Sequence, residues 1–212
     1  MNILAIDTST KFTCVGICKN DNEFFSENKI LGRKQSELLN VMTENILREN
    51  NLTWPDLDYI ALTNGPGYFT GIRTGAAYVK GLAFALNIKI IPVESLEFLK
   101  YIFIQQNKNL SPEQNIIPII YAGHDYVYAS GKNLSTCEYS HENLKKYIAQ
   151  NQDAIIISDD GAKTGFDAGI KIYDVEPNAD YIAKMALSKI EDAVNPVELV
   201  INYYRQPQGM QL

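Results

Sequence analysis

Two short segments carry residue types that could hold a nucleotide. The first, Asp7-Thr8-Ser9-Thr10, directly follows the apolar run Ile3-Leu4-Ala5-Ile6, so an acid and three hydroxyls stand at the end of an expected buried strand. In a two-lobed fold, this is where phosphates and a magnesium ion would lie. The four residues are therefore a candidate nucleotide site, vestigial because Thr8 or Ser9 stands where such a turn usually has glycine. A plain turn at a strand end explains the same residues.

The second segment is Gly65-Pro66-Gly67-Tyr68-Phe69-Thr70-Gly71-Ile72-Arg73, which leads from an expected strand into an expected helix. A glycine-rich loop before a helix can form an anion site. However, the residue order is not that of a P-loop, and no lysine is placed to reach a phosphate. From the residues alone, we interpret the segment as a tight strand-to-helix turn. Pro66 would set φ there, and Gly67 would take a positive φ.

Metal and disulfide chemistry are not expected. The two histidines, His124 and His141, are 17 positions apart and form no H-x-x-x-H pair. The cysteines form no C-x-x-C motif, and Cys14 and Cys18 share one face of an expected strand, which indicates buried reduced thiols. No Ser–His–Asp arrangement supports a peptidase.

Composition and charge exclude several further classes. The 212 residues are 46% hydrophobic and 21% charged, as in an ordinary globular protein. The net charge of −6 argues against an autonomous nucleic-acid binder, so nucleic acid is expected to reach the chain through a partner. No apolar run approaches the roughly 18 residues of a membrane span. Asp7 interrupts the N-terminal apolar run, so no signal peptide and a cytoplasmic location are expected.

The elements that position these segments follow from the hydrophobic periodicity. In the first half we expect strands over Ile3–Ile6, Phe12–Cys18, Glu23–Ile30, Tyr59–Thr63 and Ile88–Val93, and helices over Arg33–Asn50, Gly71–Leu86 (capped by Thr70) and Ser95–Gln105. An antiparallel meander followed by crossover units is the order of a ribonuclease-H-like α/β lobe.

The second half repeats this plan weakly. Its expected strands are Ile116–Ala122, Tyr126–Ser130, Leu134–Tyr139, Ala154–Ser158 and Ile170–Tyr173, and its expected helices are His141–Gln150, Ala179–Ala193 and Pro196–Tyr204. The polar stretch Gln106–Gln114 is the candidate boundary. The sequence thus predicts a two-lobed α/β fold, with a mixed five-stranded sheet in residues 1–105 and a smaller, degenerate lobe in residues 106–212.

Two helices of the first lobe have more apolar surface than one sheet requires. In the helix over Arg33–Asn50, the apolar side chains fall within an arc of about 100°, and the helix over Gly71–Leu86 is small or apolar nearly all round. Two such helices form half of a four-helix bundle that a like-folded partner completes. The alternative is that packing within the lobe itself buries all of this surface. The partner-binding candidates are Leu38, Leu39, Met42, Ile46, Gly71, Gly75, Tyr78, Val79 and Leu82.

The nine residues from Gly65 to Arg73 closely resemble the G-P-G-S-F-T-G-L-R signature of the TsaB family, also called YeaZ. The site residues that this resemblance adds are Gly65, Pro66, Gly67, Tyr68, Phe69, Thr70 and Arg73. Supporting matches are Ile6-Asp7-Thr8-Ser9-Thr10, Leu57-Asp58-Tyr59-Ile60, Lys80-Gly81-Leu82-Ala83, Val93-Glu94-Ser95-Leu96 and Tyr204-Arg205. The resemblance covers about residues 1 to 100 well and the second half loosely.

The resemblance implies a two-lobed, actin-like ATPase fold and a non-catalytic subunit of tRNA N6-threonylcarbamoyladenosine modification. Such subunits pair with and activate the catalytic paralogue TsaD, together with the ATPase TsaE, and form homodimers without partners. They meet tRNA only through the complex, and no membrane is involved. No cofactor is expected on this chain, because ATP and metal belong to the partner subunits. The implied contact is a bundle of the first two helices of each subunit.

The alternative function is a nucleotide-dependent phosphotransferase or hydrolase of the same superfold, which would use Asp7. Three departures from the family pattern bear on it. Tyr68 replaces a serine, Tyr121-Ala122-Gly123-His124 replaces an Asp-Ala-Arg-like segment, and Asp159-Asp160-Gly161-Ala162 replaces a G-D-G-A turn. These departures count against nucleotide contacts in the second lobe and leave the fold and the partnership unaffected.

Overall fold

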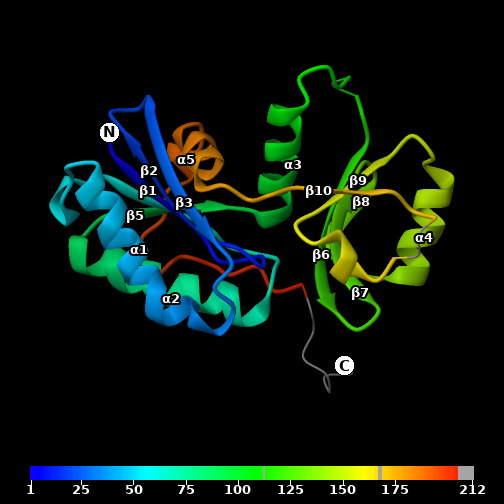
Figure 1. Cartoon of the computed structure of the whole chain (residues 1–212), viewed down its shortest axis with the longest axis horizontal. Coiled ribbons are helices and arrows are strands. Elements are labelled where there is room, and N and C mark those ends of the chain that lie inside the picture. Colours follow the sequence, from blue (N-terminus) through cyan, green and yellow to red (C-terminus); the bar gives the residue numbers. More distant parts are fainter. Residues whose placement is uncertain (112, 167–168, 205–212) are drawn as a thin grey trace.

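The computed structural model describes residues 1–111, 113–166 and 169–204, which form two five-stranded sheets flanked by helices (Figure 1). Pro112, in the expected boundary segment, and Arg205, in the last supporting match, lie outside the described residues. The elements of the first sheet and its helices are β1 (Ile3–Asp7), β2 (Thr13–Lys19), β3 (Glu23–Lys29), α1 (Gln35–Glu49), β4 (Tyr59–Thr63), α2 (Phe69–Leu86), β5 (Lys89–Val93) and α3 (Ser95–Gln106). They are followed by β6 (Ile116–Gly123), β7 (Tyr126–Gly131), β8 (Leu134–Ser140), α4 (His141–Gln150), β9 (Ile155–Ser158), β10 (Ile172–Asp174) and α5 (Ala179–Leu187).

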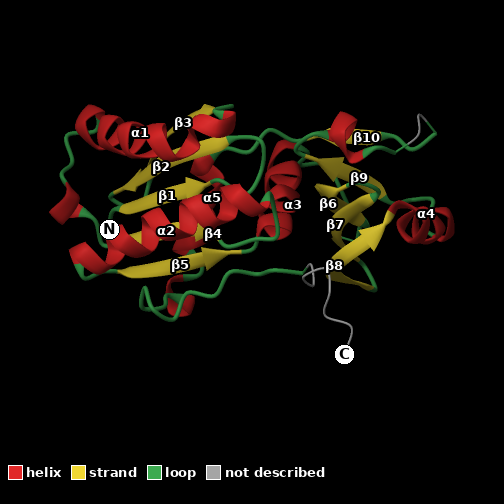
Figure 2. Ribbon diagram, turned by 90° about the horizontal axis from the view of Figure 1, so that it is seen from below, coloured by secondary structure: helices red, strands yellow, loops and turns green. Residues whose placement is uncertain are grey.

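The first sheet has the strand order β3-β2-β1-β4-β5 (Figure 2). β1 is antiparallel to β2, with Asp7 opposite Cys14, and parallel to β4, which is in turn parallel to β5. Because parallel strands end at the same edge of a sheet, the residues after β1, β4 and β5 meet there. The second sheet repeats this plan in the order β10-β9-β6-β7-β8. The predicted two-lobed α/β fold is confirmed.

Both faces of β1, in the middle of the first sheet, are buried, and alternate residues of this strand belong to different cores. Leu4 and Ile6 belong to the core beneath α1 and α2. Ile3 and Ala5 belong to the core on the opposite face, where α3 and α5 pack. A continuous apolar run is therefore required in β1, since neither face of this strand meets water.

α5 approaches the first sheet closely even though it comes late in the sequence. A Cβ atom added to Gly16 in β2 would lie 2.7 Å from the Cβ of Ala179 at the start of α5. The thiol of Cys14 donates to the carbonyl of Pro177 at 3.4 Å, and Cys14 and Cys18 are both fully buried, as predicted. α5 thus completes the core on this face.

The second sheet lies between α3 and α4 (Figure 1). Leu144 of α4 packs on the outer face, with Ile117 and Ile119 of β6. Ile116 and Ile120 of the same strand face the core that contains α3. The boundary between residues 105 and 106 remains a prediction. The two sheets fall on either side of it, while α5, from the C-terminal side, covers the first sheet.

Two predictions in the C-terminal quarter are wrong. The helix expected over Ala179–Ala193 ends at Leu187 and gives way to a short 3₁₀ helix, Ile190–Asp192. The segment expected as a helix over Pro196–Tyr204 instead forms a turn and then irregular chain. Residues 194–204, here called the C-terminal strap, run beside β5. Val194 exchanges two backbone hydrogen bonds with Ile90 at the edge of the sheet. Within the segment expected as a helix, the backbone N–H of Asn202 donates to the carbonyl of Asn64 at 2.8 Å, so this donor is satisfied by a distant segment instead of by a helical turn.

The glycines of α2 provide a matched test of the close packing between this helix and β1. A Cβ at Gly71 would lie 2.0 Å from the backbone oxygen of Thr8, whereas a Cβ at Gly81 meets nothing within 4 Å. Gly71→Ala should therefore lower the free energy of unfolding by about 2 to 4 kcal/mol. Gly81→Ala should raise it by up to about 1 kcal/mol through helix propensity. Urea denaturation followed by circular dichroism measures both, and similar effects of the two changes would contradict the packing.

Candidate functional site

The turn after β1 is buried and hydrogen-bonded within the chain. The Asp7 carboxylate accepts hydrogen bonds from the backbone N–H of Ser9 at 2.8 Å and from its hydroxyl at 2.6 Å. The hydroxyl of Thr63, at the end of β4, and that of Thr10 also donate to this carboxylate. Burial raises the pKa of Asp7 above its ordinary value, and these hydrogen bonds offset part of the rise. Asp7 thereby joins the ends of β1 and β4.

The signature segment, residues 65–73, is pressed against the same turn. The backbone N–H of Tyr68 donates to the carbonyl of Ser9 at 2.7 Å, and the hydroxyl of Thr8 donates to the carbonyl of Gly71 at 2.8 Å. A Cβ at Gly67 would lie 2.2 Å from the oxygen of Ser9. The two segments that the sequence singled out are therefore in direct contact.

Two details of the predicted turn are wrong. The residue with positive φ is Gly65 at 104°, not Gly67, and the Gly65–Pro66 peptide bond is cis. α2 begins at Phe69 rather than Gly71, and no side chain caps it. Thr70 lies within its first turn, where its carbonyl accepts a hydrogen bond from the hydroxyl of Thr74. Gly67 serves close approach to Ser9 instead of chain reversal.

The residues at this turn do not fit a bound nucleotide. Asp7, Thr8, Ser9 and Thr10 are at most 1% exposed. The hydroxyls of Thr8, Ser9 and Thr10 all donate to atoms of the chain itself. Gly67 and Gly71 cover the backbone that would have to approach a phosphate. The acid and hydroxyls predicted as a vestigial nucleotide site hold α2 against β1.

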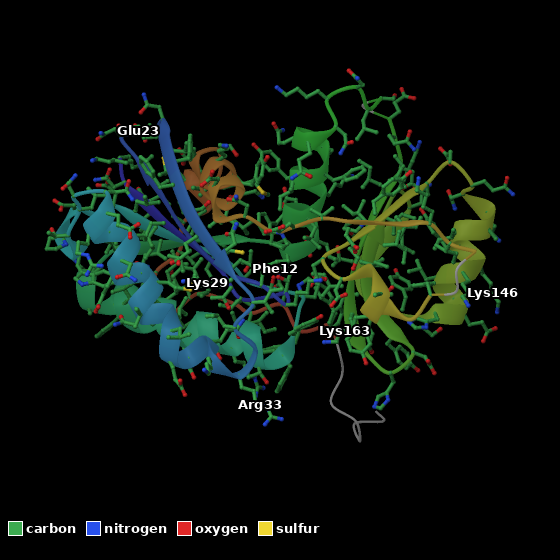
Figure 3. The ribbon with its side chains drawn as sticks, viewed as in Figure 1. Phe12, Glu23, Lys29, Arg33, Lys146 and Lys163 are labelled. Atoms are coloured by element: carbon green, nitrogen blue, oxygen red, sulfur yellow. The ribbon has the colours of Figure 1, made fainter. Side chains whose placement is uncertain are left out.

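A second group of charged and aromatic residues lies where the two sheets face each other. The backbone N–H of Lys11 donates at 3.2 Å to the carboxylate of Asp159, the residue after β9. The side-chain ammonium of Lys11 lies 3.5 Å from a carboxylate oxygen of Asp160. The ammonium of Lys163 lies 4.3 Å from the ring centre of Tyr68 and 5.2 Å from that of Tyr121. Figure 3 shows Lys163 and Phe12 at this junction. We call the residues that make these contacts the interlobe cluster: Lys11, Tyr68, Tyr121, Asp159, Asp160 and Lys163.

Burial dominates the electrostatics of the interlobe cluster. It raises the pKa of Asp159 to about 6; the N–H of Lys11 opposes the rise, and the charges of Asp7 and Asp160 add to it. Burial also raises the pKa of the Tyr68 phenol well above its ordinary value. One oxygen of Asp159 and the hydroxyl of Tyr68 have no hydrogen-bond partner in the described part of the chain. The tyrosine that departs from the family pattern is thus an interlobe contact.

The histidines and cysteines are not gathered at this junction. His124 lies in the turn between β6 and β7. His141 starts α4, where its ring centre lies 4.7 Å from that of Phe166, with the two rings tilted. No three His, Cys, Asp or Glu side chains among the described residues are grouped as a metal site would require.

The face of α1 and α2 that points away from the sheet is only partly apolar. Of the predicted partner-binding residues, six are buried within the chain's own packing: Leu39, Met42, Ile46, Gly71, Gly75 and Val79. Interpreting them as surplus surface is wrong, because the apolar helix face that the periodicity identified is the face packed on the sheet. Leu38, Tyr78 and Leu82 are partly exposed, and a partner contact for them remains a prediction.

The outer surface nevertheless has a groove and exposed apolar side chains. A groove of about 540 Å³ runs between the helices, lined by Ser36 of α1 and by Phe69, Arg73 and Ala77 of α2, among others. Phe69 is 57% exposed, Val41 of α1 is 46% exposed, and Phe84 near the end of α2 is 76% exposed. Large exposed apolar side chains beside a groove are typical of a surface that binds protein.

Arg73 is held at one end of this groove. Its guanidinium lies 3.6 Å from the ring centre of Phe69, and its Nε donates to the hydroxyl of Tyr203 in the C-terminal strap at 3.0 Å. Tyr203 is not identifiable from the sequence, since its partners are 130 or more positions away and no periodicity links them. Val41 could be found from the sequence, because it interrupts the polar side of α1, whereas Phe84 stands in a helix that is small or apolar nearly all round.

Comparisons with known proteins agree with this architecture. A family model described as "TsaD: tRNA N6-adenosine threonylcarbamoyltransferase" matches residues 27–186. The "tRNA threonylcarbamoyladenosine biosynthesis protein TsaB" of Haemophilus influenzae is 31% identical over 130 residues, which are 61% of this chain and 53% of that protein. The chain spans about half the length, or less, of the curated relatives it matches.

Two solved structures share the whole fold. A Pseudomonas aeruginosa protein described as similar to the peptidase YEAZ has a TM-score of 0.81 and 22% identity, covering 96% of this chain and 99% of its own. YeaZ from the same organism has a TM-score of 0.76 and 22% identity, covering 95% and 99%. The fold is therefore the two-lobed α/β fold of the ribonuclease-H-like, actin-like class. The chain belongs to the TsaD family.

Asp159 provides a pH-dependent test of the interlobe cluster. Its pKa of about 6 in the folded chain lies above the ordinary value of 3.8, so the folded state binds this proton more tightly than the unfolded state. The group therefore stabilises the fold at low pH, and that stability is lost as the pH rises from about 4 to 6. Asp159→Asn should raise the free energy of unfolding at pH 7.5 by roughly 1 to 3 kcal/mol. This gain should shrink steadily towards pH 4.

Denaturation of wild type and variant at pH 4, 5, 6 and 7.5 measures this difference. Asp160→Asn, at the more exposed neighbouring carboxylate, controls for simple loss of charge. A difference between Asp159→Asn and wild type that does not change with pH would contradict the assignment.

Tyr68 provides a second test, which separates its ring from its hydroxyl. Tyr68→Phe keeps the ring beside Lys163 and removes a buried hydroxyl without a partner. It should change the free energy of unfolding by less than about 0.5 kcal/mol or increase it. Tyr68→Ser, which installs the family's usual residue, should lower it by about 2 to 3 kcal/mol through lost burial and the lost cation–π contact. Equal effects of the two changes in thermal denaturation would show that the ring contributes nothing.

Proposed function

We propose that the chain is a non-catalytic subunit of tRNA N6-threonylcarbamoyladenosine biosynthesis. In this role it pairs with the catalytic paralogue TsaD and, together with the ATPase TsaE, activates transfer of the threonylcarbamoyl group to an adenosine beside the anticodon. Membership of the TsaD family and the similarity to TsaB of Haemophilus influenzae support the pathway. ATP and metal then belong to the partner subunits, and the site of action is the cytoplasm.

The observation that carries a pairing role is the outer surface of α1 and α2. It combines a groove of about 540 Å³ with an arginine stacked on an exposed phenylalanine. Arginine and aromatic side chains are the residues that most often dominate the free energy of protein–protein binding. The exposed Val41 and Phe84 extend this surface along both helices.

The turn after β1 supports a non-catalytic role. Asp7 would be the acid of a phosphotransferase or hydrolase. However, its carboxylate is fully buried and accepts hydrogen bonds from the hydroxyls of Ser9 and Thr63. Its raised pKa also disfavours the ionised form that binding a magnesium ion requires. These contacts favour the subunit over the enzyme as the function of the chain.

The charge balance supports an indirect relation to tRNA. With 25 acidic and 19 basic side chains, the net charge is −6. Phosphate binding gains its free energy from concentrated positive charge. The tRNA is therefore held mainly by other subunits, and this chain acts through the one with which it pairs.

Reconstitution tests this function. Purified chain should form no threonylcarbamoyladenosine on tRNA with ATP, threonine-derived substrate and TsaE. Adding the TsaD subunit of the same organism should produce it, at least about tenfold faster than TsaD and TsaE without the chain. Mass spectrometry of tRNA nucleosides measures the product. Transfer by the isolated chain, or no acceleration of TsaD, would contradict the proposal.

A variant on the outer surface tests how the pairing occurs. Ala77→Glu places a charge in the groove on an exposed helix position, so it should abolish co-elution with TsaD and the acceleration while the chain remains folded. Gln152→Glu, exposed after α4, makes the same change in charge away from the groove and should have no effect.

A further inference from the structure

The C-terminal strap is bonded to the start of the signature segment. The backbone N–H of Asn202 donates to the carbonyl of Asn64 at 2.8 Å, and the side-chain amide of Asn64 donates to the carbonyl of Val200 at 3.1 Å. A Cβ at Gly65 would lie 2.7 Å from the carbonyl oxygen of Asn202. Leu199 is 4% exposed and belongs to the core beneath α1 and α2. The strap therefore lies directly on the segment that leads into α2.

Tyr203 connects the strap to the outer surface of α2. Its hydroxyl accepts a hydrogen bond from Nε of Arg73 at 3.0 Å, and its ring centre lies 5.8 Å from that of Phe69. The guanidinium of Arg73 in turn lies on the ring of Phe69. Tyr203 is 46% exposed, so these contacts are part of the molecular surface. This tyrosine thus orders the arginine at one end of the groove.

Tyr204, the next residue, contacts the junction between the lobes. Its ring packs against the core that contains Val93 of the first sheet and Ile120 of the second. Burial raises the pKa of its phenol, and the charges of Glu94, directly before α3, and of Cys137, in β8, add to the rise. The phenol is therefore close to one group from each lobe. Figures 1 and 2 show the strap ending between the two sheets.

The carboxyl group of Glu94 lies where the chain passes from β5 into α3, the helix that leads to the second lobe. One of its oxygens accepts a hydrogen bond from the N–H of Glu97 at 2.6 Å, and the other has no hydrogen-bond partner in the part of the chain that the structure describes. Burial raises the pKa of this carboxyl group to about 7, and the N–H groups of Glu97 and Leu96 oppose the rise. A buried acceptor without a partner is sensitive to the groups that cover it, and the phenol of Tyr204 is nearby.

The last part of the strap can detach without disturbing either sheet. Residues 199–204 belong to no helix or strand. Local opening of such a segment costs much less free energy than unfolding of the whole chain. Because Tyr203 and Tyr204 are adjacent, displacing one of these side chains displaces the other as well.

Resting on the proposed function, in which the outer surface of α1 and α2 binds a partner, we propose that the C-terminal strap is a latch that couples this surface to closure of the two lobes. A partner that holds Arg73 and Phe69 keeps Tyr203 in place, and Tyr204 is then held at the junction. Opening of the lobes withdraws Tyr204, pulls Tyr203 away from Arg73 and weakens binding of the partner. By thermodynamic linkage, the effect of the partner on closure equals the effect of closure on the partner's affinity.

Amide hydrogen exchange in the free, full-length chain tests the latch without a partner. The N–H of Lys11 donates to Asp159 across the junction, so its exchange rate, measured by NMR, reports opening of the lobes. Tyr203→Ala should speed this exchange at least about fivefold, although the contacts of Tyr203 are with α2. Val41→Ala, which removes an exposed apolar side chain of α1 from the same surface, should leave the exchange unchanged.

A second variant keeps this test valid if Tyr203→Ala fails to fold by circular dichroism. Arg73→Gln breaks the same contact from the α2 side, so it should also speed the exchange of the Lys11 amide. Exchange that is as slow in the folded variant as in wild type would overturn the latch.

Binding of the TsaD subunit tests the coupling in the other direction. Tyr204→Ala changes the junction end of the strap, yet it should weaken TsaD binding at least about fivefold in isothermal titration calorimetry. Tyr204→Phe keeps the ring and loses the hydroxyl near Glu94, so its affinity should lie between those of wild type and Tyr204→Ala. Tyr126→Ala, at an exposed tyrosine of β7, is the matched control and should bind as wild type does.

The two experiments separate the latch from the proposed function. A wild-type chain that does not bind TsaD would contradict the proposed function alone, because exchange in the free chain involves no partner. Normal TsaD binding by Tyr204→Ala would overturn the latch, and so would normal binding by wild type together with unchanged exchange in Tyr203→Ala.

Discussion

The first sheet and the helix that follows it depend on one buried carboxylate. Asp7 ends β1 and accepts a hydrogen bond from the hydroxyl of Thr63 at the end of β4. It also fixes the turn in which the carbonyl oxygens of Thr8 and Ser9 contact the signature segment. Because the group has no access to water, each hydrogen bond compensates for lost hydration, and removing one partner would leave an unsatisfied buried acid. The glycines at 67 and 71 follow from this arrangement, since α2 must lie on the backbone of the same turn.

This arrangement also explains why a nucleotide-like motif does not make a nucleotide site. Acid and hydroxyl side chains after a strand can face a ligand or each other, and the sequence pattern is the same in both cases. Here the groups face each other, and the junction between the lobes is occupied by Lys11, Tyr68 and Lys163. The surface of α1 and α2 lies outside the junction, and it is the surface that we propose for contact with other proteins.

Hydrophobic periodicity was sufficient for the fold because most elements are defined by local patterns. The continuous apolar run of β1 follows from burial on two faces, and the order of strands and helices along the chain indicated a meander followed by crossover units. Periodicity failed where distant bonds replace local ones, as at Val194 and Tyr203 in the C-terminal strap, whose partners lie on β5 and α2. It also could not tell which apolar helix face meets the sheet and which meets solvent. Met42 was therefore assigned to a partner although it packs in the core.

The late return of α5 to the first sheet has a consequence for synthesis on the ribosome. β1 and β2 leave the exit tunnel early, yet Ile3, Ala5, Cys14 and Cys18 are covered partly by residues of α5, some 160 positions later. At about 5 to 20 residues per second, this side of the sheet waits roughly ten to thirty seconds for its cover. Throughout that interval the nascent chain exposes apolar surface of the kind that chaperones bind. The order of elements along the chain therefore delays completion of this core until α5 has been synthesised.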